Sequence, residues 1–143
     1  MIAEGPNAIV HDGTIYLIYS GSLVGIDYTT GLVTAPAGQD ADLTDPNVWT
    51  KLDYPLQKSG VYNGQWQLGT GHGMWSNDED GNLIYVFHNA EYENGRYGGR
   101  DAQVRRVHWS KEGMPILDMQ AAEELNPDYA DITMKIVVSG NEG

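Results

Sequence analysis

The chain carries Ala3-Glu4-Gly5-Pro6-Asn7 directly before the apolar run Ala8-Ile9-Val10. A carboxylate therefore stands immediately before a Gly-Pro bend, at the entrance to a predicted strand. A related arrangement returns downstream as Gly71-His72-Gly73-Met74-Trp75. Comparison of the two segments indicates that the sequence contains two copies of one unit.

The segments that follow also repeat, and they fix the offset between the two copies. Residues 11–19 (HDGTIYLIY) align with residues 79–87 (EDGNLIYVF), each an Asp-Gly turn followed by an apolar, aromatic-rich run. The offset that carries Asp12 onto Asp80 also carries Glu4 onto His72. Repeats of this kind are typical of propellers, solenoids and arrays.

Each copy has the strand content of a propeller blade. In the first copy the predicted strands are Asn7–Val10, Ile15–Ser20, Gly31–Thr34 and Trp49–Leu52, and residues 27–31 read as a turn. In the second copy they are Gly73–Ser76, Leu83–Asn89, Ala102–Trp109 and Met114–Asp118. Four short antiparallel strands make a blade, so the predicted fold class is all-β, a partial β-propeller of two four-stranded antiparallel blades. Because the innermost strand of a blade lines the central channel, we expect Glu4 and His72 near the axis, on one rim.

The predicted organisation is a single partial propeller domain over residues 1–143. Blade one covers about residues 3–60, and blade two covers about residues 61–119. The C-terminal extension, residues 120–143, is expected to hold a short helix near its start. Alternating apolar side chains over residues 132–138 predict a final strand there.

Charge and composition argue against several classes of partner. The chain has 20 Asp and Glu residues against 8 Lys and Arg, and the formal net charge of −12 argues against nucleic acid and anionic membranes. No apolar run approaches the ~20 residues of a membrane span. Residues 1–4 do not read as a signal peptide, which leaves extracellular and cytoplasmic locations open. Cysteine is absent, which excludes disulfides and thiolate chemistry.

Two features of the side-chain inventory keep alternative interpretations open. Nine Tyr and four Trp against one Phe suit a sugar-binding cleft, but they suit a β-sheet core equally well. Arg100, Arg105 and Arg106 concentrate the basic charge within one predicted strand region. Such arginines either bridge carboxylates on neighbouring strands or orient a substrate.

Four motifs, in this order, resemble those of glycoside hydrolase family 43, the five-bladed propeller enzymes that cleave arabinofuranosyl and xylosyl linkages. The motifs are Glu4-Gly5-Pro6, similar to the family's Glu-Gly/Ala-Pro; residues 69–72 (GTGH), similar to its Gly-x-Gly-His; residues 86–90 (VFHNA), similar to its Tyr-His-Ala strand; and residues 100–115, similar to its Arg…Trp-x-x-x-Gly-x-Pro ending. The similarity covers roughly the whole chain. It corresponds to the C-terminal two blades of the five-bladed propeller.

The resemblance implies roles for particular residues. It makes Glu4 the catalytic general acid, and it places His72 on the axis near a central ion, usually calcium and often held through water. Trp75 and Arg100 are the expected substrate-binding residues. The implied substrate is an arabinose- or xylose-containing saccharide of plant polysaccharides.

The sequence departs from the family in what it lacks. Family members invert configuration with an aspartate base and a second aspartate that tunes the acid, and both aspartates belong to earlier blades. The acid and base of an inverting glycosidase stand roughly 6.5–9.5 Å apart, with a water between them. None of Asp12, Asp27, Asp40, Asp42 or Asp45 lies in a comparable inner-strand motif.

We therefore expect the general-acid-bearing part of an inverting glycosidase, inactive alone. Its expected partners are the missing N-terminal blades or a second copy of the chain, because two blades leave apolar outer faces uncovered and such faces usually mark interfaces. The alternative is a non-catalytic, truncated propeller fragment or a weak carbohydrate-binding module.

Overall fold

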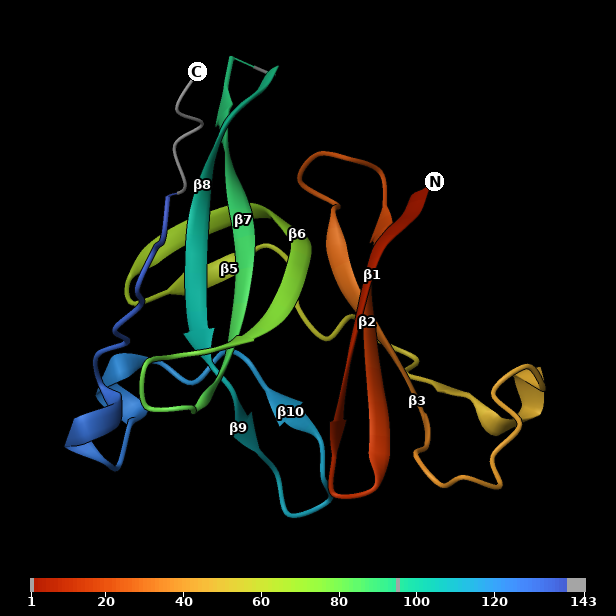
Figure 1. Ribbon diagram of the computed structural model, residues 1–143. Coiled ribbons are helices and arrows are strands. Elements are labelled where there is room, and N and C mark those ends of the chain that lie inside the picture. The colour runs from red at the N-terminus through yellow and green to blue at the C-terminus, as the bar shows by residue number, and fades with distance from the viewer. Residues whose placement is uncertain (1, 95, 139–143) are drawn as a thin grey trace, which may run out of the picture.

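The computed structural model describes residues 2–94 and 96–138 of the chain. Within them the fold is all-β, with ten strands and three short 3₁₀ turns (Figure 1). The strands form two four-stranded antiparallel sheets and one two-stranded ladder. No helix in this part of the chain is long and apolar enough to cross a membrane.

The first sheet contains the four strands predicted for the first copy. They are β1 (Ile2–His11), β2 (Thr14–Ser22), β3 (Thr29–Pro36) and β4 (Thr50–Lys51), in the order β1-β2-β3-β4. Asp12 and Gly13 close the β1–β2 hairpin with φ values of 45° and 74°, which is the turn chemistry that Asp-Gly favours. The 3₁₀ turn η1 (Pro46–Val48) lies on the long connection before β4.

The second sheet differs from the prediction at both edges. It has the order β5-β6-β7-β8, formed by β5 (Gly60–Tyr62), β6 (Gln65–Asn77), β7 (Leu83–Glu93) and β8 (Arg96–Arg106). The strand expected over 114–118 is reduced to β10 (Pro115–Ile116), which pairs with β9 (His108–Trp109) outside the sheet. The Ser110 N–H donates to the Met114 carbonyl and closes a tight turn between β9 and β10, and the ladder beside this turn is short.

β1 and its counterpart in the second sheet, β6, correspond at an offset one position smaller than the hairpin alignment predicts. Ser20 pairs with Glu4, while His88, the aligned counterpart of Ser20, pairs with Gly71. His72 is therefore the structural counterpart of Gly5, not of Glu4 as the sequence alignment predicted. The cause is one extra residue in the β6–β7 turn, where the Asp78 carboxylate accepts backbone N–H groups at 2.7 and 3.0 Å.

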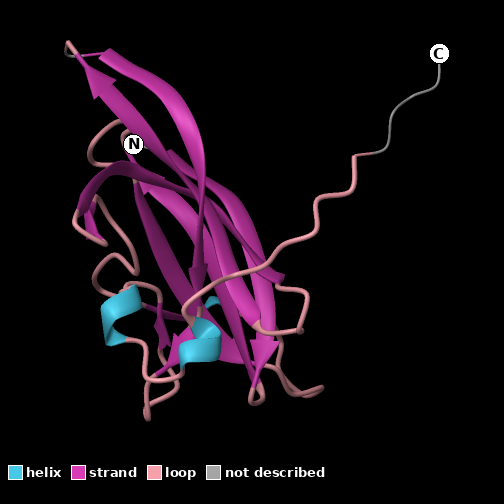
Figure 2. Cartoon of the chain, turned by 90° about the vertical axis from the view of Figure 1, so that its left-hand side faces the viewer, coloured by secondary structure: helices cyan, strands magenta, loops and turns pink. Residues whose placement is uncertain are grey.

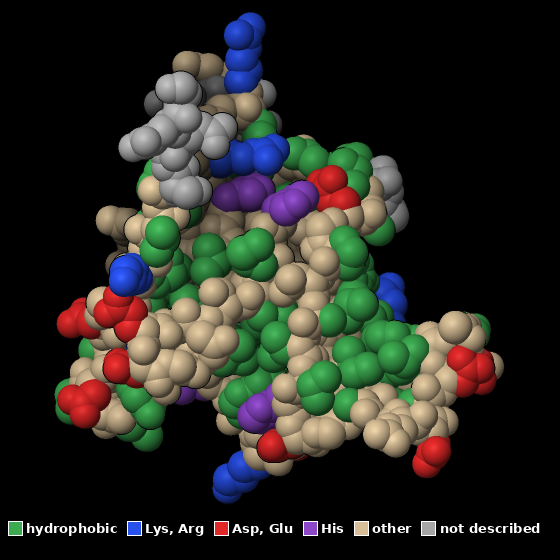
Figure 3. Space-filling view, in the orientation of Figure 1, with side chains coloured by type: hydrophobic (Ala, Val, Ile, Leu, Met, Phe, Trp, Pro, Cys, Tyr) green, Lys and Arg blue, Asp and Glu red, His purple; other side chains and the backbone are tan. Residues whose placement is uncertain are grey.

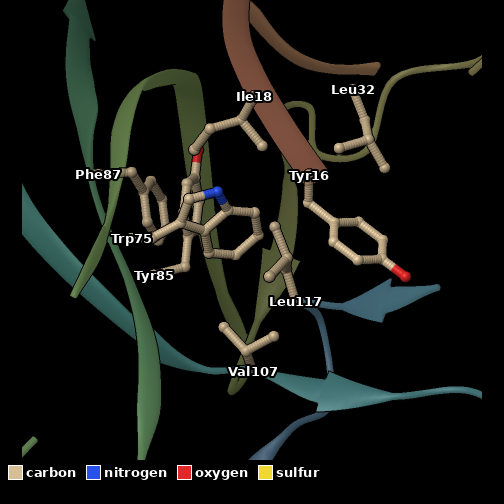
Figure 4. Packing of buried hydrophobic residues seen from close by; sticks show 8 residues of the cluster. All are labelled: Tyr16, Ile18, Leu32, Trp75, Tyr85, Phe87, Val107 and Leu117. Carbon is tan, nitrogen blue, oxygen red and sulfur yellow. The ribbon is translucent and has the colours of Figure 1, made fainter. Parts of the chain in front are cut away.

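The hydrophobic core lies between the two sheets (Figure 4). Its buried members are Tyr16, Ile18 and Leu32 from the first sheet, Trp75, Tyr85 and Phe87 from the second, and Val107 and Leu117 from the segments around β9 and β10. One buried polar contact crosses the interface, between Thr30 Oγ1 and the Tyr85 hydroxyl at 2.7 Å. Burial of each large apolar side chain is worth roughly 1.5–3 kcal/mol, so this interface makes the two sheets one structural unit.

Backbone contacts fix how the inner strands sit beside one another. The Asn7 side chain accepts the Trp75 N–H at 2.8 Å, and Ser20 Oγ accepts the His72 N–H at 2.6 Å. In both bonds a side chain of the first sheet accepts a backbone N–H of β6. The rim that carries Glu4 and His72 is therefore held at two points.

The C-terminal extension packs on the second sheet through polar contacts. It contains the 3₁₀ turns η2 (Ala121–Glu123), in place of the predicted short helix, and η3 (Pro127–Tyr129). Arg106 binds the Asp78 carboxylate at 3.0 Å and lies over the Tyr129 ring. His108 binds Glu124 at 2.7 Å.

The final strand predicted over residues 132–138 is not formed. Its side chains from Ile136 to Val138 are at least 77% exposed, and the segment runs away from the sheets (Figure 2). An alternating apolar pattern makes a strand only where a partner edge accepts its backbone bonds, and none of the described strands pairs with this segment. The remainder of the predicted extension, 139–143, lies outside the described residues.

Candidate functional site

Glu4 and His72 lie in contact on one rim of the molecule. Glu4 Oε1 stands 3.9 Å from His72 Nδ1, and the two side chains are 40% and 52% exposed. Glu4 lies at the start of an irregularity in β1, and His72 lies in the matching irregularity of β6. The sequence prediction that these two side chains share a rim therefore agrees with the geometry.

Gly5 explains why the Gly-Pro bend follows the carboxylate. Its φ of 59° lies in the left-handed region, and a Cβ there would stand 3.2 Å from His72 Nε2. His72 itself has a φ of 49°, so both strands leave the regular pleat at the same level. The bulges turn the Glu4 and His72 side chains toward each other and toward solvent.

Tyr28 lies between Glu4 and His72 and contacts both, and it was not among the residues predicted for the site. Its hydroxyl donates to Glu4 Oε1 at 2.8 Å and lies 3.3 Å from His72 Nδ1. Tyr28 is 1% exposed. Burial raises the pKa of its hydroxyl, and the neighbouring Glu4 carboxylate adds to that rise, so the group stays a hydrogen-bond donor at neutral pH. Gly71 makes the space, because a Cβ there would stand 2.6 Å from the Tyr28 ring.

The sequence carried only part of the signal for Tyr28, namely its two-residue spacing from Thr30 and Leu32. Tyr28, directly before β3, is 1% exposed like Thr30 and Leu32 within β3, and the two-residue spacing places all three on one buried face. The turn expected over residues 27–31 ends earlier than predicted. The strand pattern continues back to Tyr28 and aims its ring at the rim.

His88 forms the floor of the site behind Tyr28. The two rings stack with centroids 5.7 Å apart and an interplanar angle of 15°. Both imidazole nitrogens of His88 are buried and have no hydrogen-bond partner among the described residues. Burial lowers the pKa of His88, and the charges of Arg100 and His72 lower it further, which keeps this imidazole neutral at pH 7.

Arg100, an expected substrate contact, lies on β8 close enough to influence the site. Its guanidinium lies 5.4 Å from the Tyr97 ring centroid, and its charge acts on Tyr28 and His88. In the part of the chain that the structure describes, it makes no ion pair. Figure 3 shows histidine, acidic and basic side chains gathered near the top of the molecule, where this rim lies.

Trp75, the other expected substrate contact, belongs to the core. It is 7% exposed, and its indole packs 5.7 Å from the Tyr85 ring. Residues on β6 alternate, and Trp75 falls on the buried side while His72 and Met74 face outward. The prediction that Trp75 contacts a saccharide is therefore wrong in this chain.

A calcium ion near His72 was also expected. The described residues contain no group of three or more His, Cys, Asp or Glu side chains placed to hold a metal ion. Calcium takes six to eight oxygen ligands, and the rim supplies the Glu4 carboxylate and one imidazole. The described side chains therefore do not fit a complete calcium site.

The Glu4 carboxyl group is partly exposed and only partly engaged. Tyr28 donates to Oε1 at 2.8 Å, and Oε2 makes no hydrogen bond to a described residue. Among the described residues, the direct side-chain contacts of Glu4 are with Tyr28 and His72.

Comparisons with known proteins give one consistent family. The protein family described as "Glycosyl hydrolases family 43" matches this chain over residues 1–115. The chain is 31% identical over 134 residues to an extracellular exo-α-(1→5)-L-arabinofuranosidase of Streptomyces avermitilis, covering 88% of this chain and 27% of that protein. It is 36% identical over 120 residues to α-L-arabinofuranosidase 43 of Humicola insolens, covering 80% and 24%.

A solved structure gives the same assignment. The crystal structure of an α-L-arabinofuranosidase from Lactobacillus brevis aligns with a TM-score of 0.70 and 30% identity, over 80% of this chain and 36% of that one. The chain thus spans about a quarter of its curated relatives and about a third of this structure. Over that length, it belongs to glycosyl hydrolases family 43.

Proposed function

We propose that this chain is the general-acid-bearing, C-terminal part of an inverting glycoside hydrolase that acts on arabinofuranosyl or xylosyl linkages, with Glu4 as the acid. The observation that carries the proposal is the Glu4–Tyr28–His72 cluster on the rim. The arabinofuranosidase relatives support the substrate class. Arabinofuranosyl or xylosyl groups of plant polysaccharides are the proposed saccharide partner.

In this proposal the two four-stranded sheets are two neighbouring blades of a five-bladed propeller. Their antiparallel order, with β1 and β6 side by side at the rim, supports this arrangement. The inner strands then border the central channel, so Glu4 faces the substrate at the axis. The remaining blades come from outside this chain.

Tyr28 holds the acid in position. A general acid must present its proton to the leaving-group oxygen, and the Tyr28 hydroxyl restricts Glu4 by binding Oε1 at 2.8 Å. The free oxygen, Oε2, then carries the proton that is transferred. Arg100, whose charge reaches the same rim, is the proposed substrate contact.

The base and the tuning aspartate come from the missing blades, so the chain alone does not complete the reaction. An inverting site needs a carboxylate across from the acid to activate water. Calcium near His72 would also need ligands from the missing part, and no step of this proposal uses it.

The first test is hydrolysis of an aryl α-L-arabinofuranoside and an aryl β-D-xyloside by the purified chain. The expected result is no turnover above the buffer rate. Turnover that Glu4→Gln abolishes would contradict the missing-base proposal, because a base would then come from this chain or from a second copy.

A non-catalytic fragment or weak carbohydrate-binding module is the second candidate. It is favoured by the short span of the match, because the chain covers only about a quarter of its curated relatives. Saturable binding of arabino-oligosaccharides to the chain, unchanged by Glu4→Gln, would support this candidate over the catalytic one.

We also propose that the isolated chain associates with a second copy. Large apolar side chains remain exposed on both sheets, including Val10 on β1 (65%) and Trp66 on β6 (71%). Light scattering at micromolar concentration is the test. A mass equal to the 15.7 kDa of one chain would contradict self-association.

A further inference from the structure

A cavity with several polar side chains in its lining lies apart from Glu4 and His72. It has a volume of about 260 Å³, several times the roughly 30 Å³ that a water molecule occupies in the liquid. Its lining includes Gln57, Lys58, Tyr62, Thr70, Arg105 and Asp118. The connection between the sheets, the β5–β6 hairpin and the segment after β10 border the cavity, which is partly open to solvent. None of Glu4, Tyr28 or His72 lines it.

Arg105 gives this cavity a buried positive charge. The residue is 4% exposed, and its guanidinium lies 3.1 Å from the Tyr62 ring centroid and 4.9 Å from that of Phe87. It donates to the Val104 carbonyl and to the Gln67 side chain. Among the described residues, no carboxylate forms an ion pair with it.

The charge of Arg105 persists at neutral pH. Burial lowers the pKa of the guanidinium to about 10, which still leaves it protonated. The charge of Asp118 acts on the guanidinium without forming an ion pair, so it offsets only part of the cost of burying Arg105, and an anion bound beside Arg105 would offset more of that cost. Nη1 donates to the Val104 carbonyl and Nη2 to Gln67, which leaves three of the five guanidinium N–H groups without a hydrogen bond to a described residue.

Two neutral groups of the same cavity also lack partners. Thr70 Oγ1 and Gln57 Oε1 are buried, and neither has a hydrogen-bond partner among the described residues. Thr70 is 1% exposed. Buried polar atoms are almost always hydrogen-bonded, so a partner for the Thr70 hydroxyl and a donor for the Gln57 carbonyl are missing here.

We propose that this cavity binds a small hydroxylated carboxylate of the size and polarity of a sugar acid. The carboxylate takes the in-plane N–H groups of Arg105, which suit two parallel bonds. Hydroxyl groups of the same molecule bond Thr70 Oγ1 and Gln57 Oε1. Asp118 lines the same cavity, and its charge repels a dianion such as phosphate more strongly than a carboxylate monoanion. The proposal does not depend on Glu4, so it stands or fails separately from the proposed function.

Binding is tested with D-glucuronate, acetate, D-glucose and inorganic phosphate as probes of the purified chain. Calorimetry gives each affinity, and NMR shifts of the Thr70 methyl and the Arg105 side chain locate the binding. Glucuronate is expected to bind at least tenfold more tightly than acetate, glucose or phosphate. Absence of saturable glucuronate binding would mean that water alone fills the cavity, and it would overturn the proposal. Tighter binding of glucose or phosphate would also overturn it.

Variants separate the two halves of the proposed recognition. Thr70→Val removes the hydroxyl at nearly constant volume. It is expected to lower the affinity for glucuronate about tenfold and to leave the affinity for acetate unchanged. Arg105→Lys keeps the positive charge but loses the paired N–H donors, and it is expected to weaken the binding of both glucuronate and acetate. Thr50→Val, at an exposed position of β4, is the matched control and should change nothing. If Arg105→Lys fails to fold, Thr70→Val decides alone: glucuronate binding equal to that of the parent chain would overturn the proposal.

Discussion

Replacement of Gly5 by alanine tests the rim geometry directly. Gly5 has a φ of 59°, and an L-residue in the left-handed region costs roughly 1–2 kcal/mol. The added Cβ would also stand 3.2 Å from His72 Nε2 and 3.3 Å from Cδ2. Because the His72 side chain is 52% exposed, it can move into solvent by a few tenths of an ångström. The expected loss of unfolding free energy is therefore the backbone cost alone, about 1–2 kcal/mol.

Gly13→Ala is the matched control for this substitution. Gly13 has a φ of 74°, and a Cβ there would meet no atom within 4 Å. Urea unfolding followed by tryptophan fluorescence should give both variants similar losses, within about 0.5 kcal/mol. NMR of the histidine rings should show His72 shifted in Gly5→Ala and unchanged in Gly13→Ala. An unshifted His72 ring in Gly5→Ala would refute the packing of Gly5 against that ring.

Two further predictions concern stability. Tyr85→Phe and Thr30→Val each leave a buried hydroxyl unpaired, so each should lower the free energy of unfolding in urea by about 1–3 kcal/mol. The double variant should lose clearly less than the sum of the two single losses. Additive losses would mean that the two hydroxyls do not interact. Acid should destabilise the chain, because the pKa values of Asp78 and Glu124 both lie below their ordinary 3.8 and 4.5. Their stabilisation is complete above those ordinary values and is lost as pH falls through the lower folded values, so unfolding free energy should drop below about pH 4.5. Asp78→Asn with Glu124→Gln should reduce that drop, and an unchanged acid profile would contradict the assignment.

The two ionic contacts behind the acid prediction differ in cause. Burial alone would raise the pKa of Asp78, but hydrogen bonds from Asn82 and Arg106 outweigh it. For Glu124 the backbone N–H of Asn126 is the largest cause of the lowered pKa, and His108 adds to it. Both carboxylates therefore stabilise the fold as anions, one in the β6–β7 turn and one in the C-terminal extension.

Local turn chemistry made much of the fold predictable. Asp12-Gly13 specifies a tight hairpin, and the repeated Asp80-Gly81 marks the equivalent connection, so the central strands of both sheets follow from the sequence. The one-residue error in matching β1 with β6 arose because the second turn is longer. An alignment anchored on the hairpins cannot show how many residues a turn takes up before the strand resumes.

The failures concern partners that are distant in the sequence. Residues 132–138 alternate as a strand does, but the described residues offer them no pairing edge. Tyr28 became a site residue only because β3 brings it beneath Glu4, a contact across 24 residues. Trp75 could have been assigned correctly, since it lies three positions from His72 and an alternating strand places the two on opposite faces.

The central claim is that Glu4 is the acid of a site completed by the missing blades. It is tested most directly by joining this chain to the part of the Humicola insolens relative that this chain does not cover on its N-terminal side. The chimera is expected to hydrolyse an aryl α-L-arabinofuranoside. Glu4→Gln should then lower kcat/KM by roughly 10²–10⁴-fold, the usual contribution of a general acid. Glu112→Gln, at an exposed carboxylate, should leave kcat/KM unchanged. An active chimera whose kcat/KM is unaffected by Glu4→Gln would contradict the account.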